Sequence, residues 1–360
     1  MILEGTDMND KIVNDKPLAS FCLISYNQEQ YIREAIEGAF SQTYSPLEII
    51  LSDDCSSDRT FEIMKEMVAE YNGPHTIILN RNGKNLGIGG HVNTVASLAS
   101  GTWLTMAAGD DVSYPHRVSV CMDYAIRSPR ALAIVSRFDT IISSAEIRHY
   151  DGGCSSVTIE EMSVQKYPVL HIKGAVAVWH RQLFNKPLPS GLVHEDTLLQ
   201  YRAFCGGQIL FIPERLVKFR IDVGVAGTLR RLSLDRAKSY ADYLIWEQRR
   251  NKASEWELFL FEHLVQEFDY LRTSSEYLYY MFARQVRIRR YQVKGGFDTF
   301  LSCCFEATRQ RDVYLLCELG RESVKKIIGR RGRFFLHKSR IKVMKTLNSF
   351  VCHNELSFDK

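Results

Sequence analysis

Short apolar runs alternate with amphipathic segments over the first 110 residues of the chain. Residues 18–25, 47–51 and 102–106 are apolar runs of strand length, which indicates buried strands. Residues 28–41 repeat an apolar side chain at every fourth position, as on one face of a helix, and a second such segment starts at residue 60. Strands that alternate with helices predict an α/β fold with a mostly parallel sheet and flanking helices.

Polar side chains follow each predicted strand. Tyr26 follows the first, Asp54 the second, and the pair Asp110 and Asp111 the third. Because parallel strands end at the same edge of a sheet, these groups can surround one ligand. An aromatic ring can lie against a nucleobase, Asp54 can accept the N–H of a uracil ring, and two carboxylates suit Mg²⁺ or Mn²⁺ bound to a diphosphate. The alternative for each acidic pair is that it caps the helix predicted just after it.

A loop with four glycines, residues 80–93, lies between the second and third of these strand ends. Its glycines give the backbone freedom, and Arg81 and His91 carry groups that could face phosphates. We therefore consider a diphosphate-binding loop here. The alternative is an ordinary turn that leads into a helix over residues 90–99.

Five motifs, in this order and spacing, resemble those of family 2 glycosyltransferases with the GT-A fold, of the bacterial polysaccharide and O-antigen type. They are residues 25–27, 41–44, 48–58, 85–87 and 109–111. The likeness covers about residues 17 to 222. It implies that Asp110 and Asp111 hold Mg²⁺ or Mn²⁺. It also implies a set of residues that bind the nucleotide sugar: Ser25, Tyr26, Asp54, Arg81, Asn85, Asp110 and Arg220.

The resemblance extends to the pair Glu195 and Asp196, which opens a predicted helix. Glycosyl transfer with inversion needs a base that removes the proton of the acceptor hydroxyl on the face opposite the leaving nucleotide. Asp196 stands at the family's base position, with Glu195 as the reserve candidate. The alternative is that both are first-turn residues stabilised by the helix dipole.

Three positions depart from the usual motifs of the family. Ala108 stands where the first carboxylate of Asp-x-Asp is usual, and Val92 stands where relatives carry an Arg. Asp222 replaces a His two residues after Arg220, and an ionised Asp cannot donate a hydrogen bond to a phosphate. The predicted metal ligands are therefore the last two carboxylates, and His91 or Arg81 is left to supply the positive charge.

The length of 360 residues predicts a catalytic domain with an appendage. We expect a flexible N-terminus over residues 1–16, a GT-A nucleotide-sugar-binding domain over 17–227 and a helical C-terminal region over 228–360. Residues 136–172 are expected to be less regular and to shape the acceptor pocket. Trp179 could line a sugar site or belong to the core.

The net charge of +4 is unevenly distributed, because residues 321–360 hold eleven Lys or Arg and only three Asp or Glu. Within them, residues 325–336 interleave basic and bulky apolar side chains, as helices at an anionic membrane surface do. The alternative is a solvated basic face on a helix that packs against its own protein. Nucleic acid is not an expected partner, because no DNA- or RNA-binding motif accompanies the charge.

Nine cysteines without a Cys-x-x-Cys motif indicate neither a zinc site nor a disulfide framework, so we expect a cytoplasmic protein. No apolar run reaches the roughly 18 residues of a membrane span, which leaves peripheral association at the cytoplasmic face.

The sequence thus predicts a metal-dependent inverting glycosyltransferase that uses a nucleotide-diphosphate sugar and a saccharide acceptor, free or lipid-linked, in cell-surface polysaccharide assembly. Two alternatives are a non-catalytic relative that binds nucleotide sugars or acts as a scaffold, and a nucleotidyltransferase. In the latter, Glu195 and Asp196 would have no clear role.

Overall fold

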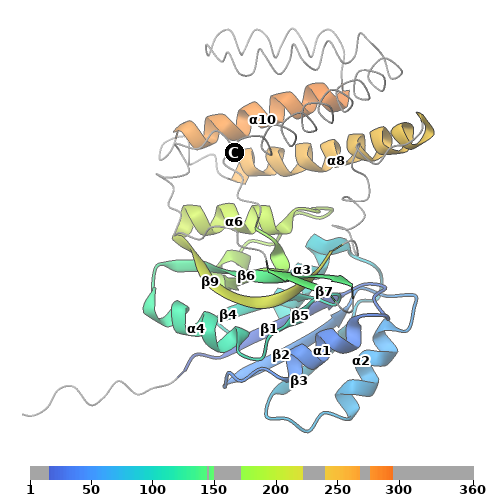
Figure 1. The fold of residues 1–360 in the computed structure, drawn as a ribbon. Helices are drawn as coiled ribbons and strands as arrows, with labels where there is room; N and C mark the ends of the chain where they lie inside the picture. Colours follow the sequence, from blue (N-terminus) through green and yellow to red (C-terminus); the bar gives the residue numbers. More distant parts are fainter. Residues whose placement is uncertain (1–15, 144–145, 150–171, 222–239, 268–275, 295–360) are drawn as a thin grey trace, which may run out of the picture. The chain divides into compact units, whose positions relative to one another are not determined.

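A computed structural model describes residues 16–143, 146–149, 172–221, 240–267 and 276–294 (Figure 1). These residues divide into two compact units. The first holds the described strands together with helices α1 to α6, and the second holds helices α8 and α10.

Four parallel strands form one half of the sheet, in the order β3-β2-β1-β4. They are β1 (Ala19–Ser25), β2 (Leu47–Asp53), β3 (Thr76–Arg81) and β4 (Trp103–Ala108). Every residue of β2 is buried, as expected for a strand covered on both faces. The predicted parallel sheet is confirmed.

Beyond β4 the sheet continues with strands of mixed direction in the order β8-β6-β9-β5, and β7 pairs with β6. They are β5 (Val112–Ser113), β6 (Ala131–Ser143), β7 (Glu146–His149), β8 (Ala177–His180) and β9 (Gln208–Arg220). β8 is antiparallel to both β4 and β6, whereas β9 is parallel to β6 and antiparallel to β5. The stretch expected to be irregular therefore begins with β6 and β7, and its residues 150–171 lie outside the described part.

Helices cover the sheet and supply the rest of the core. They are α1 (Ile32–Phe40), α2 (Thr60–Ala69), α3 (Gly87–Leu98), α4 (Arg117–Arg127), α6 (Glu195–Gly206) and the 3₁₀ turns η1 (Gly174–Val176) and η2 (Arg181–Phe184). Ile32 and Ile36 of α1 are fully buried against the sheet, which matches the four-residue apolar spacing. Trp179 is also fully buried, so it belongs to the core.

The second unit contains α8 (Tyr240–Glu267) and α10 (Glu276–Lys294), which pack against each other. Ion pairs join the two helices, from Arg289 to Glu257 at 2.7 Å and from Arg290 to Glu262 at 2.9 Å. These helices confirm the predicted helical character of this region. Across all described residues, every helix is too short or too polar to cross a membrane. The basic segment 325–336 lies outside the described residues.

Candidate active site at the carboxyl edge of the sheet

The loops that follow β1, β2 and β4 lie side by side at one edge of the sheet. Ser25 at the end of β1 pairs in register with Asp53 at the end of β2, and Ile24 pairs with Ala108 at the end of β4. The backbone N–H of Asp54 donates to the carbonyl of Ser25 at 2.9 Å. The structure therefore brings the three polar strand ends to one edge, although Tyr26, Asp54 and Asp110 are 28 and 56 residues apart in the sequence.

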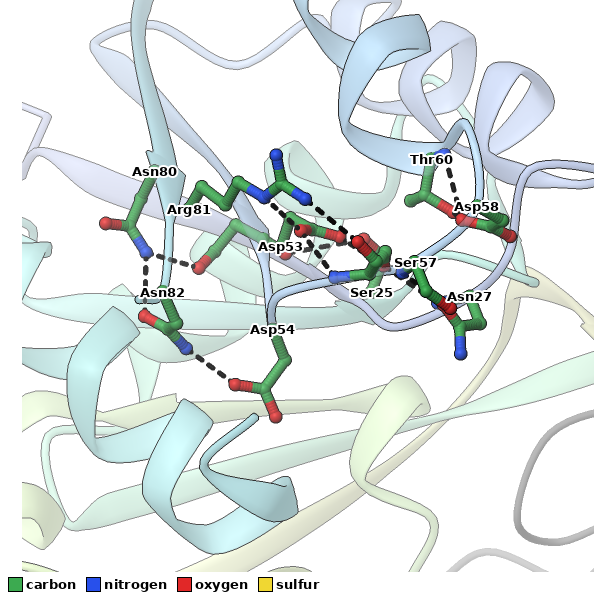
Figure 2. Close-up of polar contacts among 12 residues, drawn as sticks. Ser25, Asn27, Asp53, Asp54, Ser57, Asp58, Thr60, Asn80, Arg81 and Asn82 are labelled. Atoms are coloured by element: carbon green, nitrogen blue, oxygen red, sulfur yellow. Dashed lines mark hydrogen bonds and ion pairs between the residues drawn. The ribbon is translucent and has the colours of Figure 1, made fainter. Parts of the chain in front are cut away.

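Asp54 is buried and tied to the start of α3. Its carboxylate accepts from the side-chain amide of Asn82 at 2.8 Å (Figure 2). It also accepts from the backbone N–H groups of Leu86 at 2.9 Å and Gly87 at 3.1 Å. Asp54 thus caps a helix, although α3 rather than the helix that directly follows it. A carboxylate has about four acceptor positions. The three bonds to Asp54 therefore leave room for one more donor, such as a nucleobase N–H.

Asp53 and Arg81 organise the loop after β2. The carboxylate of Asp53 is fully buried and accepts the backbone N–H of Ser56 at 2.9 Å and its hydroxyl. The guanidinium of Arg81 lies 3.4 Å from Asp53 (Figure 2) and donates to the carbonyl of Ser56 at 2.9 Å. It also lies over the ring of Phe61. The contacts of Arg81 are therefore with this loop, and its proposed contact with a nucleotide sugar stays a prediction.

The loop after β1 is fixed to the loop after β2. Asn27 adopts a left-handed backbone with φ of 52°, and its side-chain oxygen accepts the backbone N–H of Ser57 at 2.9 Å (Figure 2). Next to it, Tyr26 is 47% exposed, an unusual state for a large aromatic ring, so its face is available to stack on a base. Ser25 is buried, and the exposed Asn85 bonds the backbone N–H of Gly87.

Asp110 and Asp111 lie at the end of β4, where Arg220 of β9 joins them. The backbone N–H of Arg220 donates to the Asp111 carboxylate at 2.7 Å, and its Nε donates to the Asp110 carbonyl at 3.0 Å. The same guanidinium pairs with Glu34 at 3.0 Å and lies over the ring of Tyr31. Arg220 therefore holds the acidic loop against α1, a role that the sequence did not indicate.

Burial raises the pKa of both carboxyl groups, and the charge of Asp110 adds to the rise for Asp111. Two desolvated acidic groups side by side become more stable when a cation is bound between or beside them. Mg²⁺ is typically held by one or two protein carboxylates together with substrate phosphates. The donor chemistry of this pair therefore fits a divalent cation, although no group of three or more His, Cys, Asp or Glu side chains suited to a metal occurs among the described residues.

A buried arginine that sequence reasoning missed bonds the residues on both sides of the acidic loop in the sequence. Arg117 is fully buried and donates to the hydroxyl of Ser113 and to the carbonyl of Met106, each at 2.9 Å. Burial lowers its pKa to about 10, while the nearby Asp111 favours its charged form. Its position could have been suspected from spacing, because Arg117 shares one face of α4 with Cys121, four residues on, which is also buried.

Glu195 and Asp196 open α6, as predicted, and lie beside η1. A Cβ atom added to Gly174 would lie 3.2 Å from a Glu195 carboxylate oxygen and 3.6 Å from the Cβ of Asp196. Burial and the charge of Asp196 raise the pKa of Glu195 well above its usual value. Because η1 packs beside β4, the two carboxyl groups belong to the same unit as the acidic loop.

His91 of α3 is buried rather than directed to solvent. Its Nε2 lies 2.7 Å from the hydroxyl of Ser52, which also accepts from the side chain of Asn80 at 2.9 Å. Burial lowers the pKa of His91. The role of His91 in supplying positive charge to a phosphate stays a prediction, and the contact shown is with the end of β2.

Comparison with known proteins finds a family model that resembles part of this chain. Residues 20–186, just under half of the chain, match the model described as glycosyl transferase family 2. The mixed α/β sheet with flanking helices agrees with the predicted fold class.

Individual relatives cover only part of the chain. An uncharacterized protein of Mycobacterium tuberculosis is 30% identical over 212 residues, which are 56% of this chain and 58% of that protein. The putative glycosyltransferase EpsE of Bacillus subtilis is 36% identical over 29% of this chain and 37% of its own length. Chondroitin synthase of Escherichia coli is 35% identical over 33% of this chain and 17% of its own length. The chain therefore spans little more than half the length of the first of these relatives.

Proposed function

We propose that this protein transfers a sugar from a nucleotide-diphosphate sugar to an acceptor hydroxyl with inversion at the anomeric carbon. The observation that carries the proposal is that Asp54, Asp110 and Asp111 follow the ends of β2 and β4 at one edge of the sheet, in the part of the chain that matches the family 2 model. The carboxylate of Asp54 can accept the N–H of a nucleobase, and those of Asp110 and Asp111 can bind a cation that holds a diphosphate. Two halves of a nucleotide sugar can therefore be bound by neighbouring loops.

The donor would lie across the ends of β1, β2 and β4. The exposed ring of Tyr26 can stack on the base, and Asp54, already held by three donors, offers its remaining acceptor position to a base N–H. Because Asp54 is held in place before the ligand arrives, little ordering of this carboxylate is needed on binding.

Asp110 and Asp111 would hold Mg²⁺ or Mn²⁺, which stabilises the charge of the departing diphosphate. Arg220 bonds the Asp111 carboxylate and the Asp110 carbonyl, and Arg117 bonds Ser113 just after this loop. Asp196 would take the proton of the acceptor hydroxyl as it attacks, and Glu195 lies next to it in the first turn of α6.

We place this reaction in the assembly of cell-surface polysaccharide, with a saccharide acceptor that is free or lipid-linked. The proposal is supported by the likeness to chondroitin synthase, whose name describes a polysaccharide product. The basic C-terminal segment would bring the protein to the cytoplasmic face of an anionic membrane.

Hydrolysis of the donor, in which water replaces the acceptor, tests the proposal without a known acceptor. Purified protein would be incubated with Mn²⁺ and α-linked UDP-, dTDP- or GDP-hexoses, and the released sugar observed by NMR as it forms. We expect the β-anomer to appear first, and Asp196→Asn to abolish release while nucleotide binding persists. First appearance of the α-anomer, or full activity of Asp196→Asn, would refute the mechanism.

A further inference from the structure

The loop that precedes Glu195 and Asp196 is held by a side chain of α3. The carboxamide of Asn93 donates to the carbonyl of Leu188 at 2.9 Å, and its oxygen accepts the backbone N–H of the same residue at 2.8 Å. Leu188 is buried, so its peptide groups need partners. Asn93 supplies both, as the backbone of a neighbouring strand would.

Helix α6 also bonds this loop and the residues just before it. The guanidinium of Arg202 is buried and donates to the carbonyls of Leu183 at 2.8 Å, Lys186 at 2.6 Å and Pro187 at 3.3 Å. Residues 183–188 are therefore fixed between a helix that carries the proposed base and a helix that touches the donor edge.

Helix α3 connects this loop to the proposed donor site. The first residue of α3, Gly87, bonds Asp54, and Asn93 is six residues further on, which is about 9 Å along the helix axis. The same helix thus contacts Asp54, the proposed base-recognition carboxylate, at its first residue and Leu188 through Asn93 in its second turn. Asn93 can therefore act on the loop without contacting any substrate.

From this arrangement we propose that Asn93 is a positioning residue. It fixes the loop before α6 relative to the donor edge, so that Asp196 meets an acceptor hydroxyl with the correct geometry. The inference rests on the proposed function, because it assigns Asp196 the role of base. Catalysis depends steeply on such placement, since small displacements of a reacting group cost large factors in rate.

The test separates the rate of reaction from nucleotide binding. Asn93→Ala removes both bonds to Leu188, Asn93→Asp keeps only the acceptor, and Ser97→Ala on an exposed part of the same helix is the matched control. For each variant, UDP binding with Mn²⁺ and its stoichiometry would be measured by calorimetry. The rate of UDP release would be measured with UDP-hexoses.

We expect Asn93→Ala to lower the rate constant of release about tenfold, with a Kd for UDP within about twofold of wild type and an unchanged stoichiometry. The rate constant of Asn93→Asp should lie between those of Asn93→Ala and wild type, and that of Ser97→Ala should match wild type. An unchanged rate in Asn93→Ala would overturn the inference, as would a rate that falls in proportion to binding stoichiometry. Absence of sugar release from the wild type with every donor tested would instead refute the proposed function.

Discussion

Asp54 has two roles in this account, one in the fold and one in donor binding, and the first has a measurable size. Asp54→Ala removes the acceptor of two backbone N–H groups at the start of α3, a loss comparable to that of a helix cap, about 0.5–2 kcal/mol. It also removes the bond from Asn82, a hydrogen bond to a charged group worth about 1.5–3 kcal/mol. We therefore expect a loss of about 3 kcal/mol in the free energy of unfolding.

Thermal unfolding followed by circular dichroism measures this loss. A domain of this size shifts by about 2–4 °C for each kcal/mol, so the midpoint should fall by about 6–12 °C. The matched control is Asp123→Ala, because Asp123 is exposed and pairs with Arg127 at 3.7 Å within one helix. An exposed pair contributes under about 1 kcal/mol, so the control should move by only a few degrees at most. A midpoint for Asp54→Ala equal to that of the control would refute the capping role.

Two further predictions concern Gly174 and Tyr114. Gly174→Ala places a Cβ 3.2 Å from a carboxylate oxygen of Glu195, so this side chain must shift. Sugar release should fall about tenfold while the Kd for UDP stays within about twofold, as measured by the assays above; an unchanged rate would show that this contact does not matter. The Tyr114 hydroxyl donates to Asp139 at 2.7 Å, and burial together with this bond raises its pKa from 10.0 to about 12. Because the folded pKa lies above the unfolded one, this stabilisation is complete below pH 10 and is lost as the pH rises towards 12. Tyr114→Phe should therefore lose less stability than wild type between about pH 10 and pH 12 in urea unfolding, and equal losses would contradict this.

Local patterns were sufficient to predict the parallel half of the sheet and the edge that carries the site. The apolar runs before Tyr26, Asp54 and Asp110 are continuous, as strands covered on both faces require, and each is followed by polar residues. The convergence of their ends follows from strand polarity alone. This part of the fold therefore needed no information about distant contacts.

The second half of the sheet could not be predicted in the same way. β6 pairs with β8 and β9, about 45 and 80 residues further along the chain, and such pairings leave no periodic signal in a local window. The apolar run over residues 174–178 has the pattern of a single strand, but it begins with the 3₁₀ turn η1 and only then enters β8. Local apolar character does not distinguish these two conformations.

The hydrogen-bond and ion-pair partners of the site residues also could not be predicted from the sequence. Asp54 was considered as a cap for the next helix, but it caps α3, and the partner Asn82 was not singled out. Arg220 was expected to face the diphosphate, and its observed partners include Glu34, 186 residues earlier. Such contacts depend on the packing of α1 and β9 and appear only once the fold is assembled.

The central claim is that a cation-dependent nucleotide site lies at the end of β4, and calorimetry tests it most directly. UDP, dTDP and GDP would each be titrated into wild type, Asp111→Ala and the control Asp123→Ala, with Mn²⁺ and with a chelator. The proposal predicts that at least one nucleotide binds wild type and the control with Mn²⁺ only, and that Asp111→Ala abolishes this binding. Binding that survives both the chelator and the Asp111 substitution, or no binding at all, would contradict it.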